Sequence, residues 1–138
     1  MSPHGIFITD CDREELLTLI EGSDSQRRDA RHVDDLAREV DRADIVASND
    51  IWPSVVTLRS RVLVRDLGLG TVEAYTIVEP DAADVARGRI SVLAPVGTAL
   101  IGSQAGDVVE WRTPGGTRRL LVEEVLYQPE AAGHEPRC

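Results

Sequence analysis

The sequence predicts an α+β protein. Two helices come first, and a domain with a mostly antiparallel sheet and one short helix follows. Two patterns in the spacing of apolar residues indicate this order. Up to about residue 47 they recur every three or four positions, as on one face of a helix, and from Val55 they alternate with polar residues, as in a strand. A third observation is a compact apolar segment, residues 89–102, that is interrupted by Pro95.

Length and charge limit the classes of function. The chain has 138 residues, enough for one domain or for one small domain with an appendage. Its net charge of −9 argues against direct nucleic-acid binding, which requires clustered Lys and Arg. Residues 1–54 hold 13 acidic residues and 6 arginines, whereas residues 55–138 hold 11 and 9. The first part is therefore the acidic part, either a solvated helical face or a surface for a basic partner.

The chain is expected to be cytoplasmic and to make no membrane contact. No apolar run approaches the ~20 residues of a membrane span, and residues 1–5 do not resemble the start of a signal peptide. Cys11 and Cys138 have no metal-ligand spacing. They could form a disulfide, but in a reducing compartment both are expected to be free thiols.

Two amphipathic helices are expected in the first part. The first begins at Thr9 or Asp10, either of which can cap it, and ends at Gly22. A polar turn leads to a second helix over residues 29–47. Helices joined by so short a turn form an antiparallel hairpin.

A boundary follows the second helix. Residues 48–54 contain helix-stopping residues and a proline, so we expect a helical hairpin over residues 1–52 and a sheet domain over residues 53–138. Trp52 is expected to pack the base of the hairpin onto the sheet domain.

The first half of the sheet domain should hold two strands and a loop. Alternation predicts a first strand from Val55, with Arg59 on its polar face, and residues 67–70 form a hairpin turn. A second strand over residues 72–78 is followed by a polar loop, residues 79–87.

The second half begins with the compact apolar segment. Residues 89–93 should form a buried strand, and Pro95 ends it and starts a short helix that closes at Gly102. Strands near residues 109–111 and over 118–127 complete the sheet. The last strand changes phase, which predicts a bulge near Glu123 and Glu124, and the tail from residue 128 onward should be loose.

The sequence shows no catalytic motif, and we expect no catalytic residue, resident metal or cofactor. The sharpest candidates for cation binding are Glu21, Asp24 and Asp29, at the turn of the hairpin. Their carboxylates could hold Mg²⁺, or they could simply cap the helices and keep the turn soluble.

Several ordered motifs carry a resemblance to known proteins. They are Val-Val-Thr-Leu at 55–58, Gly-Arg-Ile-Ser-Val at 88–92, Ala-Leu-Ile-Gly at 99–102, Gly-Asp at 106–107, Thr-Pro-Gly-Gly at 113–116 and Val-Leu-Tyr at 125–127. This segment resembles the C-terminal domain of the bacterial Gre transcript-cleavage factors. It is still more similar to the Rnk family (regulator of nucleoside diphosphate kinase), which shares that domain. The resemblance implies an FKBP-like sheet domain joined to an N-terminal helical hairpin.

Two features favour Rnk over a Gre factor. Only 54 residues precede the sheet domain, whereas a Gre hairpin is considerably longer. Two local segments also resemble the Rnk family: Leu-Ala-Pro-Val-Gly at 93–97 and Tyr-Gln-Pro-Glu-Ala-Ala-Gly at 127–133.

The resemblance implies a transcription regulator. Such a protein would bind RNA polymerase near its secondary channel, as a monomer, and compete there with Gre-type factors without cleaving transcripts. By matching positions, the polymerase-binding residues would lie in the loop and in the strand-to-helix turn after it: Asp81, Asp84, Arg87, Arg89, Ser91, Ala94 and Pro95.

Two other functions stay open. A Gre-like cleavage stimulator would use the carboxylates of the hairpin turn to bring Mg²⁺ to the polymerase, which needs a hairpin of sufficient reach. An FKBP-type prolyl isomerase would need an aromatic pocket, and the sheet domain holds only Tyr75, Trp111 and Tyr127. Fold alone does not decide activity, and we expect a regulator, not an enzyme.

Overall fold

A computed structural model of the chain describes residues 5–22 and 30–133, with the side chains of residues 30–32 excepted. Helices and strands mix along the chain, as predicted for an α+β protein. The elements are β1 (Phe7–Thr9), α1 (Asp10–Gly22), α2 (Ala30–Arg42), β2 (Asp44–Val46), β3 (Arg61–Asp66), β4 (Val72–Val78), β5 (Arg89–Ser91), α3 (Pro95–Leu100), β6 (Val108–Thr113) and β7 (Gly116–Tyr127). Two short 3₁₀ helices, η1 (Pro80–Ala82) and η2 (Val85–Arg87), lie between β4 and β5.

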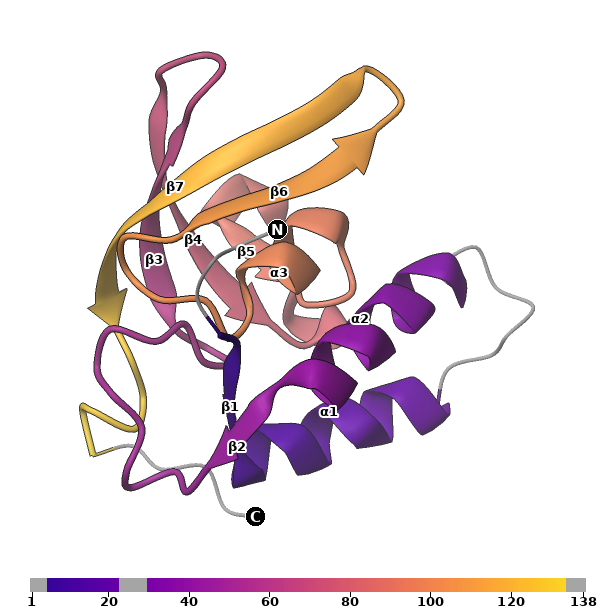
Figure 1. Ribbon diagram of the computed structural model, residues 1–138, viewed down its shortest axis with the longest axis vertical. Helices are drawn as coiled ribbons and strands as arrows, with labels where there is room; N and C mark the ends of the chain where they lie inside the picture. The colour runs from indigo at the N-terminus through magenta and orange to yellow at the C-terminus, as the bar shows by residue number, and fades with distance from the viewer. Residues whose placement is uncertain (1–4, 23–29, 134–138) are drawn as a thin grey trace.

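Five strands form the main sheet, in the order β5-β4-β3-β7-β6. All neighbours are antiparallel except β4 and β5, which are parallel because the loop with η1 and η2 carries the chain across. The sheet curls, and the hairpins β3–β4 and β6–β7 extend beyond α3 (Figure 1). Helices α1 and α2 lie side by side, and α3 lies between α2 and the main sheet.

Strand β7 contains the predicted bulge. Against β3, Leu63 pairs with Glu124 and Val64 pairs with Val122, so Glu123 is an extra residue. A second shift of this kind leaves Leu126 without a partner on β3. The bulges explain why the apolar pattern of this strand changes phase along its length.

The first helix agrees with its prediction, and the second is shorter than expected. Helix α1 runs from Asp10 to Gly22, and the Asp12 N–H donates to the Thr9 hydroxyl at 3.0 Å, as a helix cap does. Helix α2 ends at Arg42, not near residue 47. The residues after it instead form β2, which pairs in parallel with β1 in a small separate sheet.

The stretch 55–60 is not the beginning of a strand. Strand β3 starts at Arg61, and the residues before it form turns that are largely buried. The Ser60 hydroxyl accepts the Thr57 N–H at 2.9 Å, and Arg59 has a left-handed backbone with φ 70°. Alternation predicted a strand here because the apolar residues of this segment also face the core.

Three further expectations are corrected. The start of the tail is fixed, not loose: Gln128 is buried and its amide donates to the carbonyl oxygens of Trp52 and Val55, each at 2.8 Å. Trp52 meets Phe7 edge to face at 5.0 Å, but it remains 49% exposed and is not a buried anchor. Cys11 is disulfide-bonded, not a free thiol, and Cys138 lies outside the described residues.

One hydrophobic cluster spans both parts of the chain. It joins Leu16 and Leu36 of the helices to Leu100 of α3 and to the sheet residues Val64 and Val122. The antiparallel hairpin and the division at residue 52 remain predictions, since the connection over residues 23–29 lies outside the described part. None of the described helices combines the length and apolar character needed to cross a membrane.

Candidate functional site

The predicted binding loop is closed by its own backbone. Asp84 and Arg89 form an antiparallel bridge in which each N–H donates to the other carbonyl oxygen at 2.9 Å. Gly88 completes the turn with φ 72°, and a Cβ there would lie 2.9 Å from the Ala74 carbonyl oxygen of β4. The loop therefore has a fixed shape and rests against the sheet.

Its charged side chains point mostly into solvent. Asp81, Arg87 and Arg89 are exposed, and Asp84 is half-buried. The Arg87 guanidinium lies 3.6 Å from the Asp84 carboxylate. An exposed pair of this kind contributes little to stability, so these groups are available to a partner.

The strand-to-helix turn serves the fold as well as any partner. The Ser91 hydroxyl accepts the Leu93 N–H, and the Ser91 carbonyl oxygen accepts the Ala94 N–H, each at 3.0 Å. Pro95 begins α3, where its missing N–H is not needed, and it is exposed. A Cβ on Gly97 would lie 2.1 Å from the Ser91 carbonyl oxygen, so the helix can approach the strand only because this residue is glycine.

Val85 is a candidate site residue that sequence reasoning missed. It opens η2 and is 79% exposed, the most exposed of the large hydrophobic side chains in the described chain. A lone valine in an acidic loop is the signal that could have identified it. An exposed apolar group with charged neighbours is a typical contact in protein interfaces.

Arg59 connects the loop to helix α1. Its guanidinium lies 2.6 Å from the Glu15 carboxylate of α1 and 3.2 Å from Glu79, the residue before η1. Burial lowers the pKa of Arg59, but the hydrogen bond and charge of Glu15 and the charge of Glu79 outweigh it and raise the pKa. Sequence alternation had placed this arginine on the outer face of a strand.

A hollow of about 540 Å³ separates α1 from the start of η1. Asp81 is the one predicted binding residue that lines it, together with Arg59 and Leu19. The loop and the first helix thus form one continuous surface, with acidic groups from both sides.

Asp12 is a buried carboxylate beneath this surface. It is 1% exposed, and its Oδ2 accepts the Leu58 N–H at 2.9 Å while its Oδ1 has no hydrogen-bond partner. Burial raises its pKa to about 7; the Leu58 hydrogen bond and Arg59 oppose the rise, and the charges of Glu130 and Glu15 add to it. The hydroxyl of Thr57 donates to Glu130 at 2.8 Å, and the charge of this carboxyl group reaches Asp12.

The residues predicted at the hairpin turn are described only in part. Glu21 is exposed in the last turn of α1, whereas Asp24 and Asp29 lie outside the described residues. Within the described part, no cluster of three or more His, Cys, Asp or Glu could hold a metal ion.

The comparisons with known proteins cover both parts of the chain. Residues 52–127 match the model of the family "Transcription elongation factor, GreA/GreB, C-term". Residues 5–46 match the model "Rnk N-terminus".

Curated relatives and a solved structure agree with these matches. The "Regulator of nucleoside diphosphate kinase" of Escherichia coli (strain K12) is 40% identical over 134 residues, which cover 96% of this chain and 97% of the relative. The transcription elongation factor GreA of Syntrophobacter fumaroxidans is 37% identical over 93 residues, 67% of this chain and 60% of that protein. A GreA/GreB structure from Nitrosomonas europaea superposes with a TM-score of 0.72 at 38% identity and covers 90% of this chain and 99% of that one. The chain therefore belongs to the Rnk family, which shares its C-terminal part with the GreA and GreB elongation factors.

Proposed function

We propose that this protein is a transcription regulator that binds RNA polymerase near the secondary channel and competes there with Gre-type factors. The observation that carries the proposal is family membership, because the matched C-terminal part is the one shared with transcription elongation factors. A shared part that keeps an exposed, preformed loop is suited to a shared docking site. We further infer that residues 53–138 act as the FKBP-like docking part and residues 1–52 as the hairpin.

The binding surface is the loop that contains Asp81, Val85 and Arg87, together with Pro95 at the start of α3. These residues are exposed, and the Asp84–Arg89 bridge fixes the loop. A fixed loop loses little conformational entropy on binding. Its mixed charges set the orientation of the partner, and Val85 provides the apolar contact.

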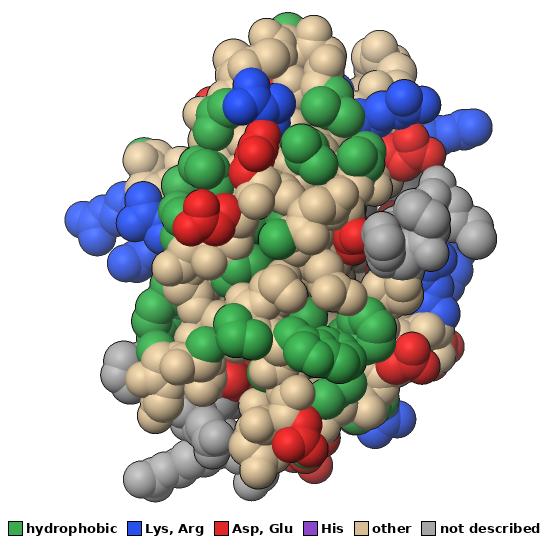
Figure 2. Space-filling view, turned by 60° about the vertical axis from the view of Figure 1, so that its left-hand side comes forward, with side chains coloured by type: hydrophobic (Ala, Val, Ile, Leu, Met, Phe, Trp, Pro, Cys, Tyr) green, Lys and Arg blue, Asp and Glu red, His purple; other side chains and the backbone are tan. Residues whose placement is uncertain are grey.

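The proposed partner is a protein, not a nucleic acid. On the face drawn in Figure 2, Arg side chains stand mainly at the left and right edges, and hydrophobic, acidic and uncharged groups occupy the centre. Together with the net charge of −9, this arrangement is unsuited to the phosphate backbone. The protein would act as a monomer in the cytoplasm, without a cofactor.

The proposal includes no transcript cleavage. Helices α1 and α2 have 13 residues each, about 20 Å at ~1.5 Å per residue. The short length of α1 keeps Glu21, near its end, close to the proposed docking surface. A short hairpin would occupy the mouth of the channel without bringing carboxylates to the catalytic centre.

A competition assay tests the proposal. A labelled Gre factor on core RNA polymerase is titrated with this protein, and cleavage of stalled transcripts is measured in parallel. We expect displacement of the Gre factor without cleavage. Cleavage that is lost in Glu21→Gln or Asp24→Asn would instead assign the protein as a cleavage stimulator, and absence of displacement at micromolar concentration would reject polymerase binding.

Val85 provides a variant that separates docking from folding. Because Val85 is exposed, Val85→Asp should leave the melting temperature unchanged and weaken displacement by about tenfold, the loss of one central interface contact. Val72→Asp is the matched control, since Val72 is 43% exposed at the opposite end of β4, where it pairs with Arg65. Equal displacement by both variants would exclude the loop as the docking surface.

A further inference from the structure

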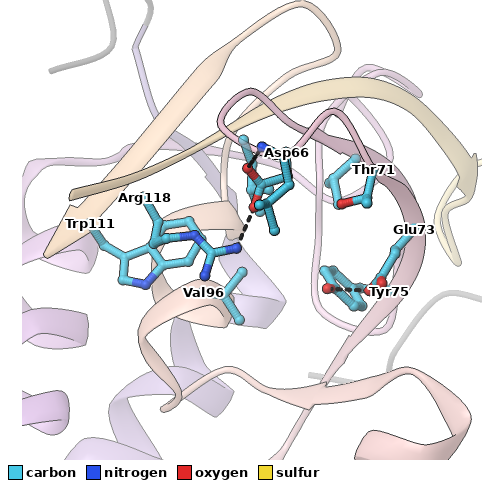
Figure 3. A pocket seen from close by; sticks show the side chains of 10 residues that line it. Asp66, Thr71, Glu73, Tyr75, Val96, Trp111 and Arg118 are labelled. Atoms are coloured by element: carbon cyan, nitrogen blue, oxygen red, sulfur yellow. Dashed lines mark hydrogen bonds and ion pairs between the residues drawn. The ribbon is translucent and has the colours of Figure 1, made fainter. Parts of the chain in front are cut away.

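A second hollow, separate from the binding loop, lies between the two long hairpins of the sheet. It has a volume of about 270 Å³ and is lined from β3, β4, β6, β7 and α3. Figure 3 shows Val96 of α3 below it, Trp111 on one side and Tyr75 on the other. Val64 and Leu120 of the sheet and Leu69 of the β3–β4 turn add to its apolar lining. The volume suits a single side chain and is small for a cofactor.

One ion pair in the hollow is already complete. The Asp66 carboxylate accepts the N–H groups of Gly68 and Leu69 at 2.8 and 2.9 Å, and it pairs with the Arg118 guanidinium. The Leu69 N–H, the Arg118 side chain and the Gly68 N–H hold the pKa of Asp66 below its usual value. The charge of Arg118 is therefore matched inside the hollow, which makes it a weak attractor for an anion.

Glu73 carries the negative charge that is left over. Its only side-chain partner in the described chain is the Tyr75 hydroxyl, which donates to Glu73 Oε2 at 2.6 Å. Burial and the neighbouring Glu73 raise the pKa of Tyr75 to about 12, so the hydroxyl keeps its proton. No guanidinium in the described part of the chain balances the Glu73 carboxylate.

The aromatic rings add a second preference for positive charge. Tyr75 and Trp111 come from β4 and β6, and each contributes to the wall of the hollow (Figure 3). The face of an aromatic ring attracts a cation, and tryptophan does so most strongly. A carboxylate, two aromatic rings and an apolar lining together match a charged head on an aliphatic stem.

We propose that this hollow binds one arginine or lysine side chain of a partner polypeptide. The cationic head lies at Glu73 and against the ring of Tyr75, and the stem lies along Val64 and Val96 toward Trp111. The net charge of −9 favours such a partner over the whole molecule. The site differs from the binding loop, which is formed by residues after β4.

The test measures binding of small model compounds to the intact chain. N-acetyl-arginine-methylamide is titrated at constant ionic strength, and the indole N–H signals of the two tryptophans are followed by NMR. N-acetyl-citrulline-methylamide has nearly the same shape but no charge. We expect a saturable shift of the Trp111 signal with the arginine compound, a shift at least severalfold weaker with the citrulline compound, and little change at Trp52.

Glu73→Gln tests the carboxylate directly. It should weaken binding of the arginine compound by about 2–5-fold, as loss of one exposed charge does. Glu124→Gln is the control, because Glu124 pairs with Leu63 on the other face of the sheet, and it should leave binding unchanged. Equal binding of both compounds, no shift at Trp111, or no effect of Glu73→Gln would overturn the proposal. The assay contains no polymerase, so its outcome is independent of the proposed function.

Discussion

The buried Asp12 links the stability of the protein to pH. Its pKa of about 7 in the folded chain stands above the ordinary value of 3.8. The folded state therefore holds this proton more tightly than the unfolded state, and the stabilisation is complete below about pH 4 and lost as the pH rises through 7. The full shift corresponds to roughly 4 kcal/mol.

We predict that Asp12→Asn flattens this dependence. The asparagine oxygen can still accept the Leu58 N–H, and the amide has no charge to desolvate. Urea unfolding at several pH values should show the variant about 2–4 kcal/mol more stable than the parent at pH 8 and nearly equal to it at about pH 4. Asp50→Asn, at an exposed position, should follow the parent curve. Identical slopes for all three proteins would show that Asp12 titrates normally.

Gly97 supports the strand-to-helix turn through its lack of a side chain. Gly97→Ala places a Cβ 2.1 Å from the Ser91 carbonyl oxygen, and neither backbone segment can move freely. We predict a loss of about 3 kcal/mol or more in the free energy of unfolding, measured by denaturant titration. Gly22→Ala is the control, since a Cβ there meets nothing within 4 Å, and it should be neutral or slightly stabilising. A neutral Gly97→Ala would mean that the contact relaxes.

At the scale of the element, the bulge in β7 determines which single-residue deletions this strand can tolerate. Removing Glu123 lets Val122, Glu124 and Val125 keep their present partners on β3, because the bulged residue is the one removed. Removing Leu121 instead shifts the start of the strand by one residue and turns Leu120 away from the core.

We therefore expect the Glu123 deletion to fold with a loss of about 1–2 kcal/mol, from the exposed Arg65 ion pair and the changed twist. The Leu121 deletion should not fold. Circular dichroism and thermal melting distinguish the two, and a folded Leu121 deletion would contradict the register.

Local signals in the sequence predicted the elements that local chemistry determines. Thr9 caps α1, Pro95 starts α3 and the phase change located the bulge of β7. Elements that depend on distant partners were missed. The three-residue strands β1 and β2 exist only because they pair with each other, and Gln128 is buried only because Trp52 and Val55 offer carbonyl oxygens.

The proposed binding surface also combines features that the sequence predicted with features that it did not. The loop over residues 81–95 could be proposed from motifs, but the exposure of Val85 and the left-handed backbone of Arg59 depend on how the segments meet in space. No short pattern predicts that an arginine will leave a strand-like segment to join Glu15 and Glu79.

At the scale of the whole molecule, the shared hydrophobic cluster predicts a single unfolding transition. Leu16 and Leu36 contact the same cluster as Leu100 and Val122, so neither part can lose its structure without exposing the other. Far-UV circular dichroism reports mainly on α1 and α2, and in a Trp52→Phe background the remaining fluorescence of Trp111 reports on the sheet. The two melting curves should coincide, and separate midpoints would show that the parts unfold independently.

The small sheet of β1 and β2 fixes the position from which both α1 and α2 extend. It holds the start of α1 and the end of α2 together, and the shared cluster secures both against the sheet domain. Any change in helix length must therefore be added at the other end, beyond Gly22 and before Ala30. Each additional seven residues per helix would extend it by about 10 Å and keep the same face toward its neighbour. Related chains could therefore differ in the length of these two helices while the proposed docking surface keeps its place relative to β1 and β2.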